Sequence, residues 1–204
     1  MCPRCRGKVV AGTLQILAFI GAPASGKTVA ATVAKDLNIP VITMGDVIRA
    51  ELQSRMLPVT DENAGRIANE LRANEGLDAI AKRCIPRIHD LLVSGMTEAE
   101  HKLIVVDGIR GVPEVEAFKR AFGTNFVLVL IDAPLSLRYT RIKNRGRGDD
   151  SLALAEFQAR EARENRWGMG EAMKQADLVL RNEGSLRAFK EQIKALLQNP
   201  RHTC

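Results

Sequence analysis

The feature that most constrains this chain is a glycine-rich segment, Gly21–Thr28 (GAPASGKT), which fits the pattern G-x-x-x-x-G-K-[S/T] without a mismatch. It directly follows the apolar, β-favouring run Leu14–Ile20 and opens the helix-like sequence TVAATVAKDL. In that setting the glycines let backbone N–H groups curl around a phosphate, and the helix N-terminus adds a favourable dipole. The pattern predicts a phosphate-binding loop; an ordinary glycine-rich turn between a strand and a helix is the alternative.

Four further apolar runs follow along the chain, separated by helical sequence. They are Ile39–Thr43, Leu103–Val106, Phe126–Asp132 and Leu178–Leu180. Continuous apolar strands of this kind are typical of a parallel sheet buried on both faces, with helices as right-handed crossovers. We therefore expect an α/β chain with the three-layer fold of P-loop nucleoside triphosphate hydrolases and a five-stranded parallel sheet.

The strand–helix alternation is interrupted twice, and both interruptions have helical sequence. We expect a helical acceptor-binding insertion at about residues 45–95 and a lid at about residues 138–167. Both belong to one P-loop kinase-like domain at residues 13–204. Residues 1–12 are expected to form an N-terminal extension.

Several residues are expected to shape these two insertions. Gly76 and Pro86 should break the first insertion into short helices, and Thr60 gives only a weak capping signal there. Gly146 and Gly148 should interrupt the second.

Composition excludes several classes of protein. No apolar run approaches the roughly 18 residues that a membrane span needs, so we expect no membrane partner. Four cysteines are too few for a disulfide scaffold in 204 residues, which favours a reducing, cytoplasmic location. Cys2 and Cys5 form a CxxC pair, which is either half of a zinc site or part of an ill-ordered tail.

The net charge of +6 is concentrated in two segments. Three basic residues lie in the first ten positions and five lie between Arg138 and Arg147, with no acidic residue in either segment. These eight positive charges are two more than the net charge of +6, so the rest of the chain carries a charge of −2. Aromatic residues make up only 4%, too few for a platform that stacks single-stranded bases. The pattern disfavours nucleic acid as a partner and points to the phosphates of a small nucleotide.

The predicted loop defines a site for ATP and Mg²⁺. Lys27 should reach the β- and γ-phosphates, and the Thr28 hydroxyl should ligate Mg²⁺. Asp107 ends the third apolar run beside the loop, where an acidic group orders Mg²⁺ through water; a carboxylate that caps the next turn is the alternative. The loop residues expected to contact ATP are Gly21, Ala22, Pro23, Ala24, Ser25, Gly26, Lys27, Thr28 and Val29.

The predicted lid supplies the cations that phosphoryl transfer needs to neutralise the moving group. Arg138, Arg141 and Arg145 fall at i, i+3 and i+7, on one face of a helix. A closing face of guanidinium groups would grip the triphosphate and exclude water. We therefore assign these three arginines to catalysis, together with Lys27 and Asp107.

Other charged residues lie near the predicted lid. Arg147 is assigned to ATP binding. Arg160 and Arg163 either contribute from the returning helix or pair with Glu161 and Glu164. A solvated basic face of a surface helix is the alternative for the whole basic run.

Two segments at the ends of predicted strands match a known family. Thr43–Arg49 (TMGDVIR) and Asp107–Arg110 (DGIR) resemble the TGDxxR and DGxPR segments of adenylate kinases, although the proline is missing here. The basic run at 138–147 resembles the arginine-rich lid of that superfamily, and Asn182–Ser185 (NEGS) resembles its base-contacting loop. The resemblance covers about residues 14–197.

A closer resemblance adds further segments to these. TMGDVIR, TDEN, AKRCIP, DGIR, WGMGE and NEGSL together resemble an archaeal family of adenylate-kinase-related P-loop proteins, with features of nucleoside monophosphate kinases and dephospho-coenzyme A kinases. The name of that family carries no settled reaction.

The resemblance implies a site for the acceptor of the phosphoryl group. Arg49 and Arg110 would clamp its phosphate, because arginine binds phosphate as a bidentate fork; exposed helix arginines are the alternative. Asn182 and Gly184 would shape the adenine pocket, or form a plain turn into the last helix. The residues implied to bind the acceptor are Thr43, Gly45, Asp46, Arg49 and Arg110.

These observations predict an ATP-dependent phosphotransferase that acts on a nucleoside monophosphate, and the resemblance implies AMP. Asp46 leaves a second reaction open, since a ribose hydroxyl, as in dephospho-coenzyme A, benefits from a carboxylate that takes its proton. Asp46 would otherwise be a helix N-cap. A nucleotide-binding regulatory or assembly protein with slow ATPase activity is the third possibility. We expect a monomer or a small homo-oligomer.

Overall fold

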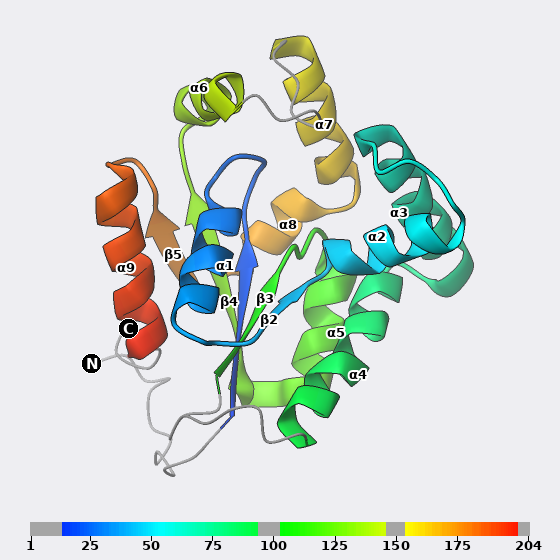
Figure 1. Ribbon diagram of the computed structural model, residues 1–204, viewed down its shortest axis with the longest axis horizontal. Coiled ribbons are helices and arrows are strands. Elements are labelled where there is room, and N and C mark those ends of the chain that lie inside the picture. The colour runs from blue at the N-terminus through cyan, green and yellow to red at the C-terminus, as the bar shows by residue number, and fades with distance from the viewer. Residues whose placement is uncertain (1–13, 94–102, 146–153, 200–204) are drawn as a thin grey trace.

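The computed structural model describes residues 14–93, 103–145 and 154–199, and its centre is a five-stranded parallel sheet in the order β2-β3-β1-β4-β5 (Figure 1). The strands are β1 (Gln15–Ile20), β2 (Val41–Thr43), β3 (Leu103–Asp107), β4 (Phe126–Asp132) and β5 (Leu178–Arg181). The predicted α/β fold and its five parallel strands are confirmed.

Helices cover both faces of this sheet and form the two insertions. They are α1 (Lys27–Asp36), α2 (Gly45–Ser54), α3 (Asp61–Glu75), α4 (Ala79–Val93), α5 (Val112–Phe122), α6 (Leu135–Arg145), α7 (Leu154–Arg166), α8 (Met169–Met173) and α9 (Leu186–Gln198), with a 3₁₀ turn, η2 (Gly123–Asn125). None of them is long and apolar enough to cross a membrane, as far as the described residues extend.

The central strand β1 is buried on both faces, as its continuous apolar sequence predicts. Leu17 and Phe19 pack in one cluster with side chains of α1 and α9. Ile16, Ala18 and Ile20 pack in the other cluster, with side chains of α4, α5 and α8. All five are fully buried, which gives the three-layer arrangement seen in Figure 1.

The first insertion forms the helices α2, α3 and α4. Thr60 is a true N-cap of α3, because its Oγ1 accepts a hydrogen bond from the Asn63 N–H at 3.1 Å. Gly76 ends α3 with φ +100°, as expected. Pro86, however, does not break the helix, since α4 continues through it to Val93.

Tertiary packing explains why the prediction for Pro86 was wrong. Ile80, Cys84 and Ile88 lie on one face of α4 and are buried in the core. A proline inside a helix costs about 3 kcal/mol, and burial of three apolar side chains at about 1.5–3 kcal/mol each more than offsets it. Burial also raises the pKa of the Cys84 thiol to about 12, so this thiol stays protonated and unreactive at neutral pH.

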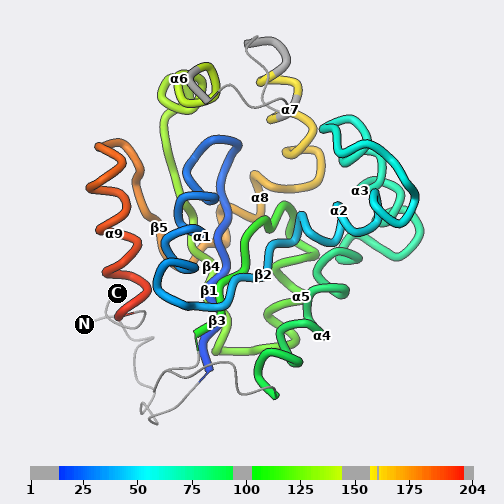
Figure 2. The backbone as a smooth tube through the Cα atoms, viewed as in Figure 1, coloured from blue at the N-terminus to red at the C-terminus, as the bar shows by residue number. Residues whose placement is uncertain are grey.

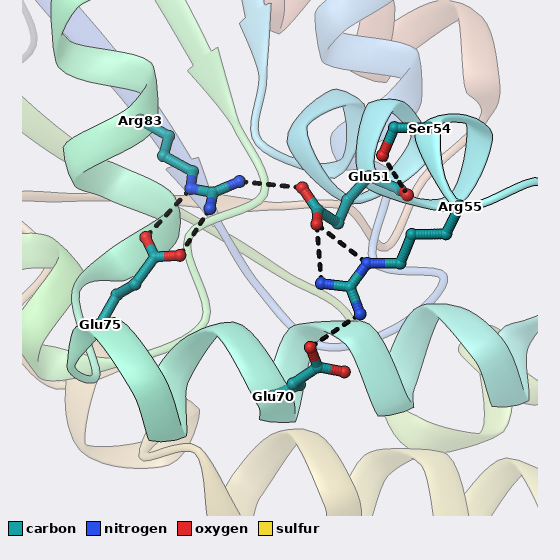
Figure 3. A network of polar contacts seen from close by, with 6 residues as sticks. All are labelled: Glu51, Ser54, Arg55, Glu70, Glu75 and Arg83. Atoms are coloured by element: carbon teal, nitrogen blue, oxygen red, sulfur yellow. Dashed lines mark hydrogen bonds and ion pairs between the residues drawn. The ribbon is translucent and has the colours of Figure 1, made fainter.

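An ion-pair network ties the three insertion helices together (Figure 3). Arg55, the C-cap of α2, bridges Glu51 and Glu70, with the Arg55 Nη1–Glu70 Oε1 distance at 2.7 Å. Arg83 of α4 bridges Glu51 at 3.1 Å and Glu75 at 2.5 Å. Because Glu51 accepts from both arginines, α2, α3 and α4 behave as one connected unit.

The second insertion contributes α6 and α7, which lie beyond the carboxyl ends of the strands, on the same side as the loop between β1 and α1 (Figure 2). The predicted breaks at Gly146 and Gly148 lie outside the described residues, as do Cys2, Cys5 and Arg147.

The Glu51 network predicts a pH-dependent contribution to stability. Hydrogen bonds from Arg55 and Arg83 hold the pKa of the Glu51 carboxyl below its usual value. A lowered pKa means that the stabilisation is present above the unfolded-state pKa of about 4.3 and is lost as the pH falls through the folded-state value. We expect Glu51→Gln to lower the free energy of unfolding by about 1 kcal/mol at pH 7 and by less at pH 3.

Urea unfolding at the two pH values measures this difference. Glu116→Gln is the matched control, because Glu116 is exposed on α5 and its nearest arginine nitrogen is 3.9 Å away. An equal loss at both pH values for Glu51→Gln would contradict the assigned charge effect.

Candidate active site

The phosphate loop joins the carboxyl end of β1 to the first turn of α1. Gly21 has φ +156°, and a Cβ there would lie 2.3 Å from the Ile131 carbonyl oxygen of β4, so a side chain does not fit. Gly26 has φ +121°, and the Ser25 N–H donates to the Ala22 carbonyl oxygen at 3.1 Å. The chain therefore makes the tight curl before a helix N-terminus that binds phosphate in P-loop proteins.

Lys27 folds back across this curl. Its Nζ donates to the carbonyl oxygens of Gly21 at 2.5 Å and Ala22 at 3.0 Å. The ammonium group thus lies against the loop in which the phosphates of ATP would bind. Thr28, the next residue, is exposed in the first turn of α1. The structure brings both residues to one curl, as the motif predicts.

Asp107 lies beside the loop at the carboxyl end of β3, in register with Phe19 of β1. Its Oδ1 is buried and has no hydrogen-bond partner among the described residues. Burial raises the pKa of this carboxyl, and the positive charge of Lys27 opposes the rise. A buried oxygen without a donor, close to the Lys27 ammonium group, is suited to a metal-bound water.

These groups fit Mg²⁺ held jointly by protein and nucleotide. Within the described ranges no three His, Cys, Asp or Glu side chains converge on one point. Mg²⁺ in kinase sites is bound through one or two protein oxygens, several waters and the substrate phosphates. Thr28 and Asp107 would supply the protein oxygens, and the ion would neutralise charge on the transferred group.

Arg138 and Arg141 point from α6 toward the phosphate loop. Arg138 is buried; its guanidinium donates to the Pro23 carbonyl oxygen at 3.4 Å and pairs with Glu161 of α7 at 2.8 Å. Arg141 Nη2 donates to the Asn182 carbonyl oxygen at 2.9 Å. The alternative of a solvated basic face is therefore wrong for these two residues. The Arg145 and Arg160 side chains lie outside the described part of the chain.

Asn182 supports the phosphate loop from the end of β5. It is buried, and its Nδ2 donates to the Ser25 carbonyl oxygen at 2.7 Å. Its backbone N–H donates to the Asp132 carbonyl oxygen at 2.7 Å, and its Oδ1 accepts from Arg141 Nη2 at 3.1 Å. The side-chain amide and the backbone groups of Asn182, which were expected to shape the adenine pocket, are thus hydrogen-bonded to other protein atoms. Two residues on, Gly184 is open, since a Cβ there would meet only Ala188 Cβ, at 3.9 Å.

A cavity of about 460 Å³ lies between the first insertion, the segment after β3 and the end of α7. Its volume is within the range of small-molecule sites. Gly45, Arg49 and Arg110 line it, as predicted for the acceptor site. Thr43 and Asp46 are not part of its lining. Met44, rather than Asp46, is the N-cap of α2, so the N-cap alternative for Asp46 is wrong.

Every arginine that lines this cavity has a carboxylate partner. Arg110 pairs with Glu164 of α7, and Arg163 of α7 pairs with Asp61 of α3 at 2.5 Å rather than with Glu161 or Glu164. The remaining two pairs are Arg49–Asp46 and Arg72–Glu114, the latter at 2.8 Å. The positive charges in the wall of the cavity are therefore balanced by carboxylates.

Trp167 completes the wall, and sequence reasoning did not assign it a role. Its indole Nε1 donates to Asn69 at 2.7 Å, and the Arg72 guanidinium lies 4.6 Å from its ring centroid. Arg72 and Asp61 were missed as well, because helix patterning treats them as ordinary surface positions. The one signal was that Trp167 is the single tryptophan of the chain.

Comparison of the sequence with known proteins agrees with this geometry. A UPF0200 protein of Methanosarcina barkeri is 45% identical over 186 residues, which cover 91% of this chain and 96% of that protein. The chain belongs to the UPF0200 family. A UPF0200/UPF0201 protein of Archaeoglobus fulgidus is 51% identical over 184 residues, and the match spans 55% of that longer protein. The predicted membership of an archaeal P-loop family is confirmed.

Domain and structure comparisons show the fold of this UPF0200 member. Residues 20–158 match a family described as an AAA domain. The solved structures of TT1252 from Thermus thermophilus and of a gluconokinase from Sinorhizobium meliloti are 24% and 15% identical, each with a TM-score of 0.52. They cover 91% and 93% of this chain, and the matches span 97% of each solved chain. These likenesses show that the chain shares its overall fold with both structures.

The packing around Gly26 generates a prediction for the loop. A Cβ at Gly26 would lie 2.5 Å from Asn182 Nδ2 and 2.9 Å from Phe189 Cε1. We expect Gly26→Ala to weaken ATP binding at least about tenfold and to cost about 1–3 kcal/mol of stability, because the curl must open. Calorimetric titration with ATP and urea unfolding measure the two effects.

Gly123→Ala is the control for backbone strain. Gly123 has φ +56°, but a Cβ there would meet nothing within 4 Å. It should lose about 1 kcal/mol of stability and keep its ATP affinity. Equal ATP affinity in the two variants would contradict the role assigned to the Gly26 curl.

Proposed function

We propose that this protein transfers the γ-phosphoryl group of ATP to a nucleoside monophosphate, with AMP as the acceptor. The observation that carries the proposal is the segment after β3. Asp107 faces the phosphate loop, and three residues later Arg110 lines the acceptor cavity. A single short segment therefore joins a phosphate-binding loop to a cavity of small-molecule size.

The residues have distinct roles in this proposal. Lys27 and the lid arginines Arg138, Arg141, Arg145 and Arg147 would neutralise the charge of the triphosphate, and Mg²⁺ would be held through Thr28 and Asp107. Arg49 and Arg110 would bind the acceptor phosphate, with Thr43, Gly45 and Asp46 at the edge of the site. An acceptor phosphate is already ionised, so the reaction needs alignment and charge neutralisation but no general base.

The position of Asp46 bears on the alternative, transfer to a hydroxyl acceptor such as dephospho-coenzyme A. A general base must reach the proton that it removes. Asp46 lies outside the cavity lining and pairs with Arg49, and both side chains are about half exposed (53% each). This arrangement favours a phosphate acceptor over a hydroxyl acceptor.

The direct test is incubation of the purified protein with Mg·ATP and one acceptor at a time, with ADP and phosphorylated product measured. We expect ADP and product with AMP. Product with dephospho-coenzyme A alone would replace AMP by the hydroxyl acceptor. Tight ATP binding without acceptor-dependent turnover would favour a nucleotide-binding regulatory protein.

Lys27→Ala tests the phosphate loop. Loss of this cation from the triphosphate should reduce the rate of transfer about 10²–10³-fold while leaving the thermal unfolding midpoint close to that of the parent. Lys35→Ala, at the exposed end of α1, is the matched control and should retain the parent rate. Retained transfer in Lys27→Ala would overturn the assignment.

Arg110→Lys tests the acceptor site while leaving a cation for Glu164. Lysine lacks the planar fork that binds a phosphate through two hydrogen bonds. We expect the KM for AMP to rise about tenfold and the KM for ATP to change less than about twofold. An effect confined to the KM for ATP would contradict the assignment of Arg110 to the acceptor phosphate.

A further inference from the structure

Glu164 places a buried carboxylate against the acceptor cavity. It lies in α7 and is only 2% exposed. Arg110 Nη1 donates to its Oε1, and both residues line the cavity. The Arg110 side chain itself is 32% exposed. The cation proposed to bind the acceptor phosphate therefore already holds an internal anion.

The backbone of Arg110 is fixed from the opposite side. Its N–H donates to Glu114 Oε2 at 2.7 Å, and the other Glu114 oxygen accepts from Arg72 at 2.8 Å. Glu114 is 1% exposed and belongs to α5, which packs on the central sheet. Because this buried pair holds the segment after β3, Arg110 is the stationary member of its contact with Glu164.

The contacts of α7 are easier to rearrange. Arg163 pairs with Asp61, and these side chains are 26% and 36% exposed. Ion pairs that water reaches contribute less than fully buried ones. The Arg163–Asp61 pair therefore opposes a movement of α7 less than the buried Arg72–Glu114 pair opposes a movement of the segment that carries Arg110.

We infer that Glu164 is an internal stand-in for the acceptor phosphate, which the acceptor displaces from Arg110, so that acceptor binding releases α7. The inference rests on the proposed function in one respect, the role of Arg110 as a phosphate ligand. While Glu164 occupies Arg110, α7 is held in one position. A phosphate that takes its place frees the helix that also carries Glu161, the partner of Arg138 at the phosphate loop.

This competition has a thermodynamic signature. When a site must first be vacated, the apparent affinity of the ligand falls by the fraction of molecules in which the site is vacant. Removing the internal carboxylate should therefore strengthen phosphate binding. A merely structural ion pair predicts the opposite, because its loss would loosen Arg110 and weaken binding.

The test is Glu164→Gln, titrated with AMP and with orthophosphate in the absence of ATP. We expect about tenfold tighter binding of both ligands than in the parent. We also expect faster ATP hydrolysis without acceptor, because α7 is no longer held. Trp167, the single tryptophan, lies 5.9 Å from the Arg110 guanidinium, so its fluorescence should change on AMP binding in the parent and change less in the variant.

Asp61→Asn separates competition from a general charge effect. It removes one negative charge from the same cavity wall without touching Arg110. Competition predicts that only Glu164→Gln tightens binding about tenfold, whereas a charge effect predicts similar tightening in both variants. Glu164→Asp, which keeps the charge and shortens the reach, should be intermediate and serves if Glu164→Gln fails to fold.

The outcomes distinguish this inference from the proposed function. Equal or weaker binding in Glu164→Gln, equal tightening in Asp61→Asn, or no binding of either ligand to any of the proteins would overturn the inference. Tighter binding in Glu164→Gln without transfer to AMP would support the inference and contradict the proposed function.

Discussion

The site depends on the burial of β1 at the centre of the parallel sheet. Because β1 is covered on both faces and flanked by β3 and β4, its carboxyl end has a fixed position. The chain must reverse there beside Ile131 of β4, which leaves no room for a side chain at Gly21. The same parallel arrangement brings the end of β3 alongside, so that Asp107 lies next to the loop. Both halves of the site follow from strand ends that meet at one edge.

Sequence patterning predicted the parts of the molecule that local chemistry determines. The five strands and the phosphate loop follow from apolar runs and a motif that act over a few residues. Gly45, Arg49 and Arg110 were assigned to an acceptor site through the family resemblance, and they line the cavity. Pro86 was misjudged because the packing of α4 against the core decides its conformation. The partners of the arginines were also out of reach, because pairs such as Arg163 with Asp61 join residues that are 102 positions apart.

Those partners change the physical picture of the acceptor site. Counted along the sequence, the arginines suggest a strongly positive pocket. In three dimensions each lining arginine faces a carboxylate, so in the proposed reaction an incoming phosphate would exchange one ion pair for another. Such an exchange would cost less desolvation than filling a site with bare charges, and it would let binding move a helix.

The ion pairs of the first insertion also differ in their access to salt. Water reaches the network of Glu51, Arg55 and Arg83, whereas the Arg72–Glu114 pair is almost fully buried. Mobile ions screen exposed charges strongly and buried charges weakly. Raising the ionic strength therefore weakens the exposed ion pairs more than the buried one. Concentrated salt loosens the contacts among α2, α3 and α4, while the Arg72–Glu114 pair keeps α3 attached to α5.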